Sequence, residues 1–162
     1  EQARIEEAAG AIAILKAANF SVGINVLLSL VGRLAAELGD DYDIEIVEAH
    51  HRAKVDAPSG TALWLLQAIT EATGRDPHTD VVHGRSGAIG PRPPRQIGVH
   101  ALRLGDNPGC HTIHFATAGE RLSLTHAATS RDTFARGALR AAEWVARRRP
   151  GMYTMADCLD AR

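Results

Sequence analysis

The sequence predicts an α+β fold, in which a mixed and mainly antiparallel sheet carries helices on one face. The first observation is a block of β-rich segments that are separated only by short turns containing Gly, Asn, Asp or Pro. These segments are Gln96–Leu104, His111–Thr117 and Arg121–His126. The second observation is that segments with a helical spacing of apolar residues flank this block on both sides. Strands and helices grouped in this way are typical of an α+β domain.

The first fifteen residues differ from the rest of the chain. Residues 1–10 are typical of the end of a helix that stops at Gly10, and Ala11–Leu15 is a continuous apolar run of strand length. Such a run suits a parallel strand that is covered on both faces. Two interpretations are open at this point. The helix and strand are the tail of an α/β domain, or the strand is a short edge strand of the same domain as the rest.

Three longer helices are predicted. Apolar residues at helical spacing indicate a helix from Asn19 to about Leu38, which Gly39 ends. Ser59 is the predicted N-cap of a second helix, from Gly60 to about Thr73. A third helix, rich in Ala, is predicted over Arg131–Arg148. These helices supply the apolar faces that cover the sheet.

Two segments lie between the helices and the block of β-rich segments. Tyr42–His51 begins with the alternation of a strand, so we expect a strand between the first two long helices. Arg75–Arg95 is rich in Gly and Pro, and we expect a mobile loop there.

Composition excludes several classes of function. The net charge of −1 and the pI of 6.8 give no global positive field for nucleic acid or membrane surfaces. No apolar run approaches the roughly 20 residues that a membrane span needs. Two cysteines, Cys110 and Cys158, do not make a disulfide framework in a domain of this size, so a reducing, cytoplasmic setting is expected.

The start of the second helix is a candidate anion site. The backbone N–H groups of Gly60, Thr61 and Ala62 point out of this helix start, where the helix dipole favours an anion by about 0.3–1 kcal/mol. Gly60 also lets a ligand approach the backbone closely. The alternative is that Ser59 is only a cap, which is the usual role of such a residue.

Basic residues directly upstream favour the functional interpretation. His50, His51, Arg52 and Lys54 bring donors and positive charge to the loop that faces the helix start. A cluster of this kind suits a carboxylate or phosphate, and a histidine with a lysine can also supply protons. Adjacent strand residues point to opposite faces, so at most one of the two histidines lies in the pocket unless the strand has already ended there.

The stretch Glu48–Ala62, which reads Glu-Ala-His-His-Arg-Ala-Lys-Val-Asp-Ala-Pro-Ser-Gly-Thr-Ala, resembles the signature of the dihydrodipicolinate reductase (4-hydroxy-tetrahydrodipicolinate reductase) family. Other segments resemble further blocks of that family in the same order. They are Ala17–Gly23, Gly105-Asp106, His111-Thr112, Gly119–Leu122, His126 and Ser130–Ala138. The resemblance covers about residues 10–160.

The resemblance implies roles for individual residues. The positions that match the family's acid–base residue and its proton donor are His50 and Lys54. The positions that match the residues holding a substrate carboxylate are His51, Ser59, Gly60 and Thr61. The positions that match the cofactor contacts near the domain hinge are Ala17, Ala18, Asn19 and Phe20, with Arg131 close to the same hinge.

The resemblance also implies the activity and the domain organisation. It implies an NADH- or NADPH-dependent reductase that delivers hydride to a cyclic dicarboxylate imine in the diaminopimelate route to lysine, in the cytoplasm and as a homotetramer. Residues 1–20 would be the last helix and strand of a Rossmann-type α/β nucleotide-binding domain, with the hinge. Residues 21–131 would bind substrate and form the oligomer, and residues 132–162 would return toward the nucleotide-binding domain.

Two features depart from the family pattern. No G-x-G-x-x-G precedes Ala11, and the chain starts at Glu1 without an initiator Met. We therefore expect a chain that starts late in the nucleotide-binding domain, and that by itself binds a dicarboxylate weakly without reducing it. Cys110 stands where the family usually has Glu, which affects the contacts expected around His111.

Other functions fit the sequence less well than the reductase. Cys110, His111 and His114 resemble a metal-ligand cluster, but strand positions three apart face opposite ways, so no metal is predicted. A serine hydrolase built on Ser59 lacks the glycines of a nucleophile elbow. A non-catalytic oligomerisation or anion-binding module remains the alternative, and dicarboxylate binding is the observation that separates it from the enzyme.

Overall fold

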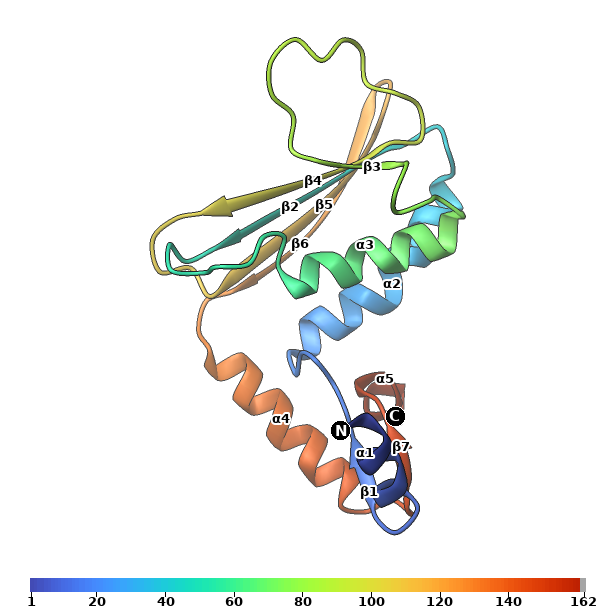
Figure 1. Ribbon diagram of the computed structural model, residues 1–162, viewed down its shortest axis with the longest axis vertical. Helices are drawn as coiled ribbons and strands as arrows, with labels where there is room; N and C mark the ends of the chain where they lie inside the picture. The colour runs from blue at the N-terminus through green and yellow to red at the C-terminus, as the bar shows by residue number, and fades with distance from the viewer. Residues whose placement is uncertain (161–162) are drawn as a thin grey trace. The chain divides into compact units, whose positions relative to one another are not determined.

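The computed structural model describes residues 1–160, which form two compact units (Figure 1). One unit comprises residues 27–129, and the other comprises residues 1–26 together with the segment that begins at Ser130. Helix α2, Val22–Leu38, runs from one unit into the other. The predicted fold class, α+β with a mixed sheet, is confirmed.

The larger unit is built on a five-stranded sheet of order β3-β4-β2-β5-β6. The strands are β2 (Asp43–His50), β3 (Val81–His83), β4 (Ile97–Arg103), β5 (Gly109–Thr117) and β6 (Glu120–Ala128). The long antiparallel pairings join β2, β5 and β6, whereas β4 runs parallel to both β2 and β3. Helices α2 and α3 (Gly60–Thr73) lie against one face of the sheet (Figure 1). The predicted bounds of α3 are therefore confirmed.

Strand β2 alternates between the helix-covered face and the opposite face. Ile44 and Ile46 are fully buried in the core that the sheet shares with α2 and α3. Because side chains two apart share a face, Glu48 and His50 continue the same row toward the end of the strand, and both are buried. The buried face of β2 thus contributes apolar side chains to the core at its start and polar side chains to a site at its end.

The prediction of a mobile loop over Arg75–Arg95 is wrong for residues 81–83. The β-branched pair at the start of β3 extends the sheet by pairing Val81 with Ile97 of β4. The following residues are also held: the Arg85 guanidinium donates two hydrogen bonds, of 2.8 and 3.0 Å, to the Glu45 carboxylate. Burial would raise the pKa of Glu45, but hydrogen bonds from Arg85, His100 and Arg92 outweigh it and lower the pKa to about 2.

The smaller unit contains both ends of the described chain. It holds α1 (Gln2–Ala9), β1 (Ala13–Leu15), α4 (Asp132–Val145), β7 (Gly151–Tyr153) and α5 (Met155–Asp160). Strand β1 is parallel to β7 and does not join the five-stranded sheet, so the edge-strand interpretation of residues 11–15 is wrong. The short elements β7 and α5 were not predicted, because three or six residues show no clear period.

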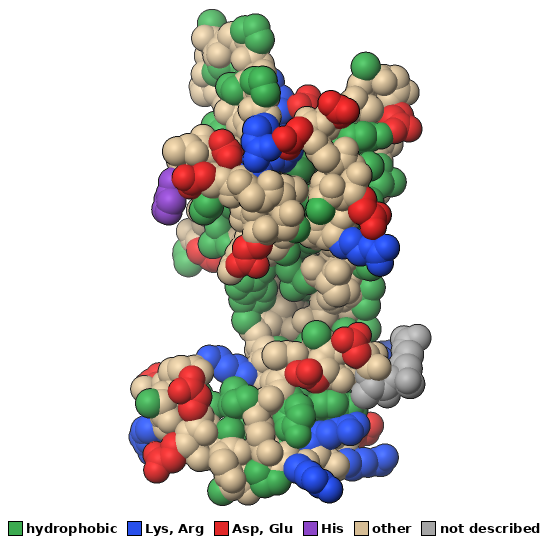
Figure 2. Space-filling model, turned by 90° about the vertical axis from the view of Figure 1, so that its right-hand side faces the viewer, with side chains coloured by type: hydrophobic (Ala, Val, Ile, Leu, Met, Phe, Trp, Pro, Cys, Tyr) green, Lys and Arg blue, Asp and Glu red, His purple; other side chains and the backbone are tan. Residues whose placement is uncertain are grey.

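The surface carries charges of both signs. Figure 2 shows acidic and basic side chains interspersed on one face of the molecule, as expected for a net charge of −1. Among residues 1–160, no helix combines the length and the apolarity that crossing a membrane requires.

Candidate active site

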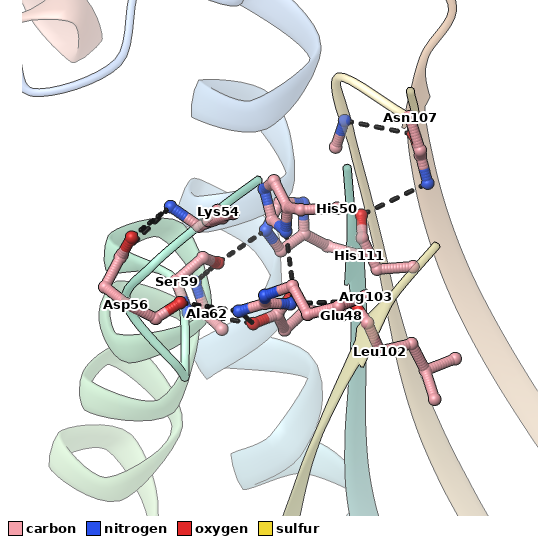
Figure 3. A network of polar contacts seen from close by, with 12 residues as sticks. Glu48, His50, Lys54, Asp56, Ser59, Ala62, Leu102, Arg103, Asn107 and His111 are labelled. Carbon is pink, nitrogen blue, oxygen red and sulfur yellow. Dashed lines mark hydrogen bonds and ion pairs between the residues drawn. The ribbon is translucent and has the colours of Figure 1, made fainter. Parts of the chain in front are cut away.

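The Glu48 carboxylate is the centre of a polar network on the helix-covered face of the sheet (Figure 3). Its Oε1 accepts from Arg103 Nη2 at 2.8 Å and from the backbone N–H of Ser59 at 3.0 Å. Its Oε2 accepts from Arg103 Nη1 at 2.8 Å and lies 2.6 Å from His50 Nδ1. Burial would raise the pKa of Glu48, but the hydrogen bonds from Arg103, His50 and Ser59 outweigh it and hold the pKa below its usual range. The carboxylate is therefore ionised at neutral pH.

Arg103 connects the strands to the loop before α3. It lies opposite His50 in the β2–β4 pairing, 55 residues further along the chain than Glu48. Besides its two-pronged contact with Glu48, its Nη2 donates to the backbone carbonyl of Asp56 at 2.6 Å. The same guanidinium thus holds both the carboxylate and the loop that carries Lys54.

His111 of β5 lies next to His50 on the same face. Their rings meet edge to face, with centroids 5.1 Å apart. His111 Nε2 is 3.0 Å from Ser59 Oγ, and the side chain is buried. Burial, followed by the nearby charge of His50, lowers the pKa of His111 to about 4. His111 is consequently neutral near pH 7.

Ser59 caps helix α3 as predicted. Its Oγ accepts from the backbone N–H of Ala62 at 3.2 Å. The expectation that the N–H of Ala62 is free for a ligand is therefore wrong, because the cap already uses it. Gly60 remains open: a Cβ placed on it would have no heavy atom within 4 Å. Thr61 follows it in the first turn and is half-buried. The accessible part of the predicted anion site is thus the Gly60 end of the helix start.

Lys54 lies in the loop between β2 and α3. Its Nζ contacts both carboxylate oxygens of Asp56, at 2.8 and 2.9 Å, and this ion pair lowers the pKa of Asp56. His51 lies directly after β2, half-buried, and its carbonyl accepts from the Lys54 N–H at 3.1 Å. His50 is on the buried face and His51 is already beyond the strand, so the two histidines do occupy different environments.

The predicted cofactor residues belong to the smaller unit. Ala17, Ala18, Asn19 and Phe20 follow strand β1, and Arg131 occupies the N-cap position of α4. Asn19 Oδ1 accepts from the Ser21 N–H at 2.8 Å, which shapes the start of α2.

Two residues of the site were not found by sequence reasoning. Arg103 has no local signal, because only the pairing of β4 with β2 brings it to Glu48. Gly109 belongs to a glycine-containing turn in the sequence, but its Cα faces His50: a Cβ there would lie 2.9 Å from His50 Nε2.

His111 and His114 are separated as expected, since His114 hydrogen bonds Ser123 instead. Within the described part of the chain, no group of three His, Cys, Asp or Glu side chains is arranged to hold a metal ion.

The fold and site together define an α+β domain that presents a buried carboxylate–imidazole pair beside an open helix start. The model of the family described as "Dihydrodipicolinate reductase, C-terminus" matches residues 23–159. The chain belongs to this family.

Named relatives agree with this membership. The chain is 56% identical to the 4-hydroxy-tetrahydrodipicolinate reductase of Thiobacillus denitrificans over 158 residues, 98% of this chain and 59% of the relative. It is 54% identical to the enzyme of the same name from Myxococcus xanthus, over 97% of this chain and 58% of the relative. The chain therefore spans a little under three fifths of the length of these curated relatives.

A solved structure has the same fold. The dipicolinate-bound dihydrodipicolinate reductase of Paenisporosarcina sp. TG-14 superposes with a TM-score of 0.71 at 26% identity. The similarity covers 94% of this chain and 57% of that one.

Proposed function

We propose that this chain is the substrate-binding and proton-donating part of a 4-hydroxy-tetrahydrodipicolinate reductase. The enzyme would reduce 4-hydroxy-tetrahydrodipicolinate to tetrahydrodipicolinate with NADH or NADPH, in diaminopimelate and lysine biosynthesis. The observation that carries the proposal is the buried Glu48–His50 pair beside the open start of α3, in a chain that belongs to this family.

The substrate carboxylate would lie at the start of α3. Four residues would hold it: His51, Ser59, Gly60 and Thr61. The open space at Gly60 leaves room for a carboxylate close to the backbone, where the helix dipole stabilises an anion. That the Paenisporosarcina structure is dipicolinate-bound supports a small dicarboxylate as the ligand class.

Lys54 and His50 would handle protons. The Lys54 ammonium has three N–H donors and forms an ion pair with Asp56. The Asp56 side chain is 55% exposed, so a substrate carboxylate can compete with Asp56 for the ammonium. A proton donor in this loop would reach a ligand held at the helix start. His50 is paired with an ionised Glu48, and an imidazole in such a pair is a suitable group for acid–base chemistry.

The nicotinamide cofactor would be held by residues of the smaller unit. Ala17 to Phe20 follow the carboxyl end of the parallel strand β1, which is where open α/β sheets bind dinucleotides. Ala17, Ala18, Asn19, Phe20 and Arg131 are therefore proposed as cofactor contacts. When bound, the cofactor supplies the hydride.

Assembly, location and domain roles complete the proposal. Leu102, on the face of the sheet opposite α2 and α3, is 50% exposed, and we propose that another copy covers this face in a homotetramer. Cys110 and Cys158 are both free, in keeping with a reducing cytoplasm. Residues 1–20 would be part of the nucleotide-binding domain, with the hinge. Residues 21–131 would bind the substrate and form the oligomer. Residues 132–162 would be the helix and tail that return toward the nucleotide-binding domain.

Turnover and binding test different parts of this proposal. In a full-length reductase that contains this chain, Lys54→Ala should lower turnover by ~10²–10⁴-fold, the usual contribution of a positioned proton donor. Arg33→Ala is the control, because it removes one positive charge from an exposed position of α2, where Arg33 pairs with Glu37. Turnover within threefold of wild type in the Lys54→Ala enzyme would contradict the proton-donor role. Binding of pyridine-2,6-dicarboxylate without any turnover would instead favour an anion-binding module.

A further inference from the structure

The hydrogen bonds around Glu48 determine which nitrogen of His50 carries the proton. The carboxylate has two donors on each oxygen: Arg103 and the Ser59 N–H on Oε1, Arg103 and His50 on Oε2. An ionised carboxylate accepts hydrogen bonds and donates none. At a separation of 2.6 Å, His50 Nδ1 must therefore be the donor. Neutral His50 then has its free lone pair on Nε2.

We propose that Glu48, together with Arg103, is a positioning residue that fixes His50 in the Nδ1–H tautomer and reserves Nε2 for proton exchange with the substrate. This inference rests on the proposed function and deepens it. Two residues besides His50 and Lys54 would then contribute to proton transfer. Glu48 on β2 and Arg103 on β4 would hold His50 in the tautomer that can act as a base.

The surroundings of Nε2 agree with this role. Gly109 borders it, and any side chain there would begin 2.9 Å from the nitrogen. The groups facing His50 come from three elements: Glu48 on β2, Arg103 on β4 and His111 on β5. Arg103 hydrogen bonds the same carboxylate, and burial keeps His111 neutral near pH 7. The negative charge of Glu48 is the one that the imidazolium meets directly.

Arg103 extends the arrangement to the loop. Its contact with the Asp56 carbonyl joins the carboxylate–imidazole pair to the segment that carries Lys54. A change at Arg103 should consequently affect both the ionisation of Glu48 and the placing of Lys54. A change at Glu48 should affect the tautomer of His50 most directly.

Glu48→Gln keeps the size of the side chain but replaces one accepting oxygen of the carboxylate with a donating NH₂ group. Arg103 donates to both carboxylate oxygens, so the other partner of each oxygen decides the orientation of the amide. The Ser59 N–H at Oε1 can only donate, whereas His50 at Oε2 can change its tautomer, so the amide oxygen takes the place of Oε1 and Arg103 Nη1 loses its acceptor at Oε2. The amide NH₂ then faces His50, so Nδ1 becomes the acceptor and the proton moves to Nε2. A neutral His50 of that tautomer cannot act as a base toward the substrate. Glu48→Asp keeps the carboxylate and should restore part of the wild-type behaviour.

Nitrogen-15 NMR of the His50 ring in this chain tests the tautomer. We expect Nδ1–H in the wild type, Nε2–H in Glu48→Gln, and Nδ1–H again in Glu48→Asp. Glu37→Gln, an exposed change on α2, is the control and should leave the His50 signals unchanged. Nε2–H in the wild type overturns the proposal, and this observation does not require any variant to fold.

Kinetics in a full-length reductase containing the chain provides the second readout. Glu48→Gln should lower kcat by ~10²–10⁴-fold, the loss expected when a base is held in the wrong tautomer, with KM changed by less than about threefold. It should also shift the acidic limb of the pH–rate profile to lower pH, because the imidazolium loses its counter-charge. An unchanged profile with kcat within threefold would refute the positioning role while leaving the reductase assignment intact. A wild type that reduces no substrate would refute the proposed function, and the NMR result would still decide the tautomer.

Discussion

His111 couples the pH of the solution to the stability of the larger unit. The side chain is only 4% exposed, and burial together with the charge of His50 lowers its pKa from 6.5 to about 4. In the unfolded chain the same imidazole is expected to titrate near its ordinary value. Below pH 6.5 the unfolded chain therefore binds a proton that the folded unit does not. The free energy of unfolding should decrease as the pH falls through this interval.

The magnitude follows from the difference between the two pKa values. Each pH unit between them removes about 1.4 kcal/mol from the free energy of unfolding. The loss begins near pH 6.5 and levels off near pH 4, so it amounts to roughly 3 kcal/mol in total. About 2 kcal/mol of this falls between pH 7 and pH 5. His111→Gln removes the titrating group and should lack this part of the pH dependence, whatever its own stability at pH 7.

Urea unfolding at pH 7, 6 and 5 measures the effect. The fluorescence of Trp64, in α3, reports on the larger unit if Trp144 of the smaller unit is replaced by Phe in every protein compared. His114→Gln is the matched control, because His114 lies on the opposite face of β5 and hydrogen bonds Ser123. If the wild type and His111→Gln lose the same free energy between pH 7 and pH 5, the folded-state pKa of His111 is not depressed and the reasoning is wrong.

Three further predictions concern binding, packing and assembly. Gly60→Ala should leave the free energy of unfolding unchanged or raise it by up to about 1 kcal/mol. It should nevertheless weaken pyridine-2,6-dicarboxylate binding in calorimetry, because the added Cβ enters open space that the ligand would use. Unchanged binding would show that the anion does not approach the Gly60 amide. Gly137→Ala should destabilise the smaller unit by about 1–3 kcal/mol in scanning calorimetry, because a Cβ there would overlap the Phe20 carbonyl oxygen. Light scattering should give about four times the 17.3 kDa mass of one chain, and a monomer at micromolar concentration would contradict the tetramer.

Much of the local structure could be predicted, because local structure depends on near neighbours in sequence. The apolar spacing of residues 60–73 and the hydroxyl of Ser59 defined α3 and its cap before any tertiary contact was considered. The alternation that begins at Tyr42 likewise predicted the strand β2, on which the structure places Glu48 and His50 on one face. The Ala62 N–H was misassigned by the same local reasoning, since the cap and a ligand compete for one donor.

Long-range pairing could not be predicted in the same way. Nothing near Arg103 in the sequence indicates that β4 lies parallel to β2 with Arg103 opposite His50. Strand β3 was missed because a segment of three residues is too short to show an alternating pattern. These residues form a strand because they pair with the edge of β4. The pairing of β1 with β7 joins segments from the two ends of the described chain.

By itself, the sequence determined the long helices, the cap of α3 and the family, because caps, periods and a long signature are contained in contiguous residues. Only the tertiary structure decided the state of the site. The ionisation of Glu48 depends on Arg103 from another strand, and the neutrality of His111 depends on how deeply β5 is buried. Charge and tautomer are set by solvent exclusion and by partners distant in sequence, and both exist only once the sheet has formed.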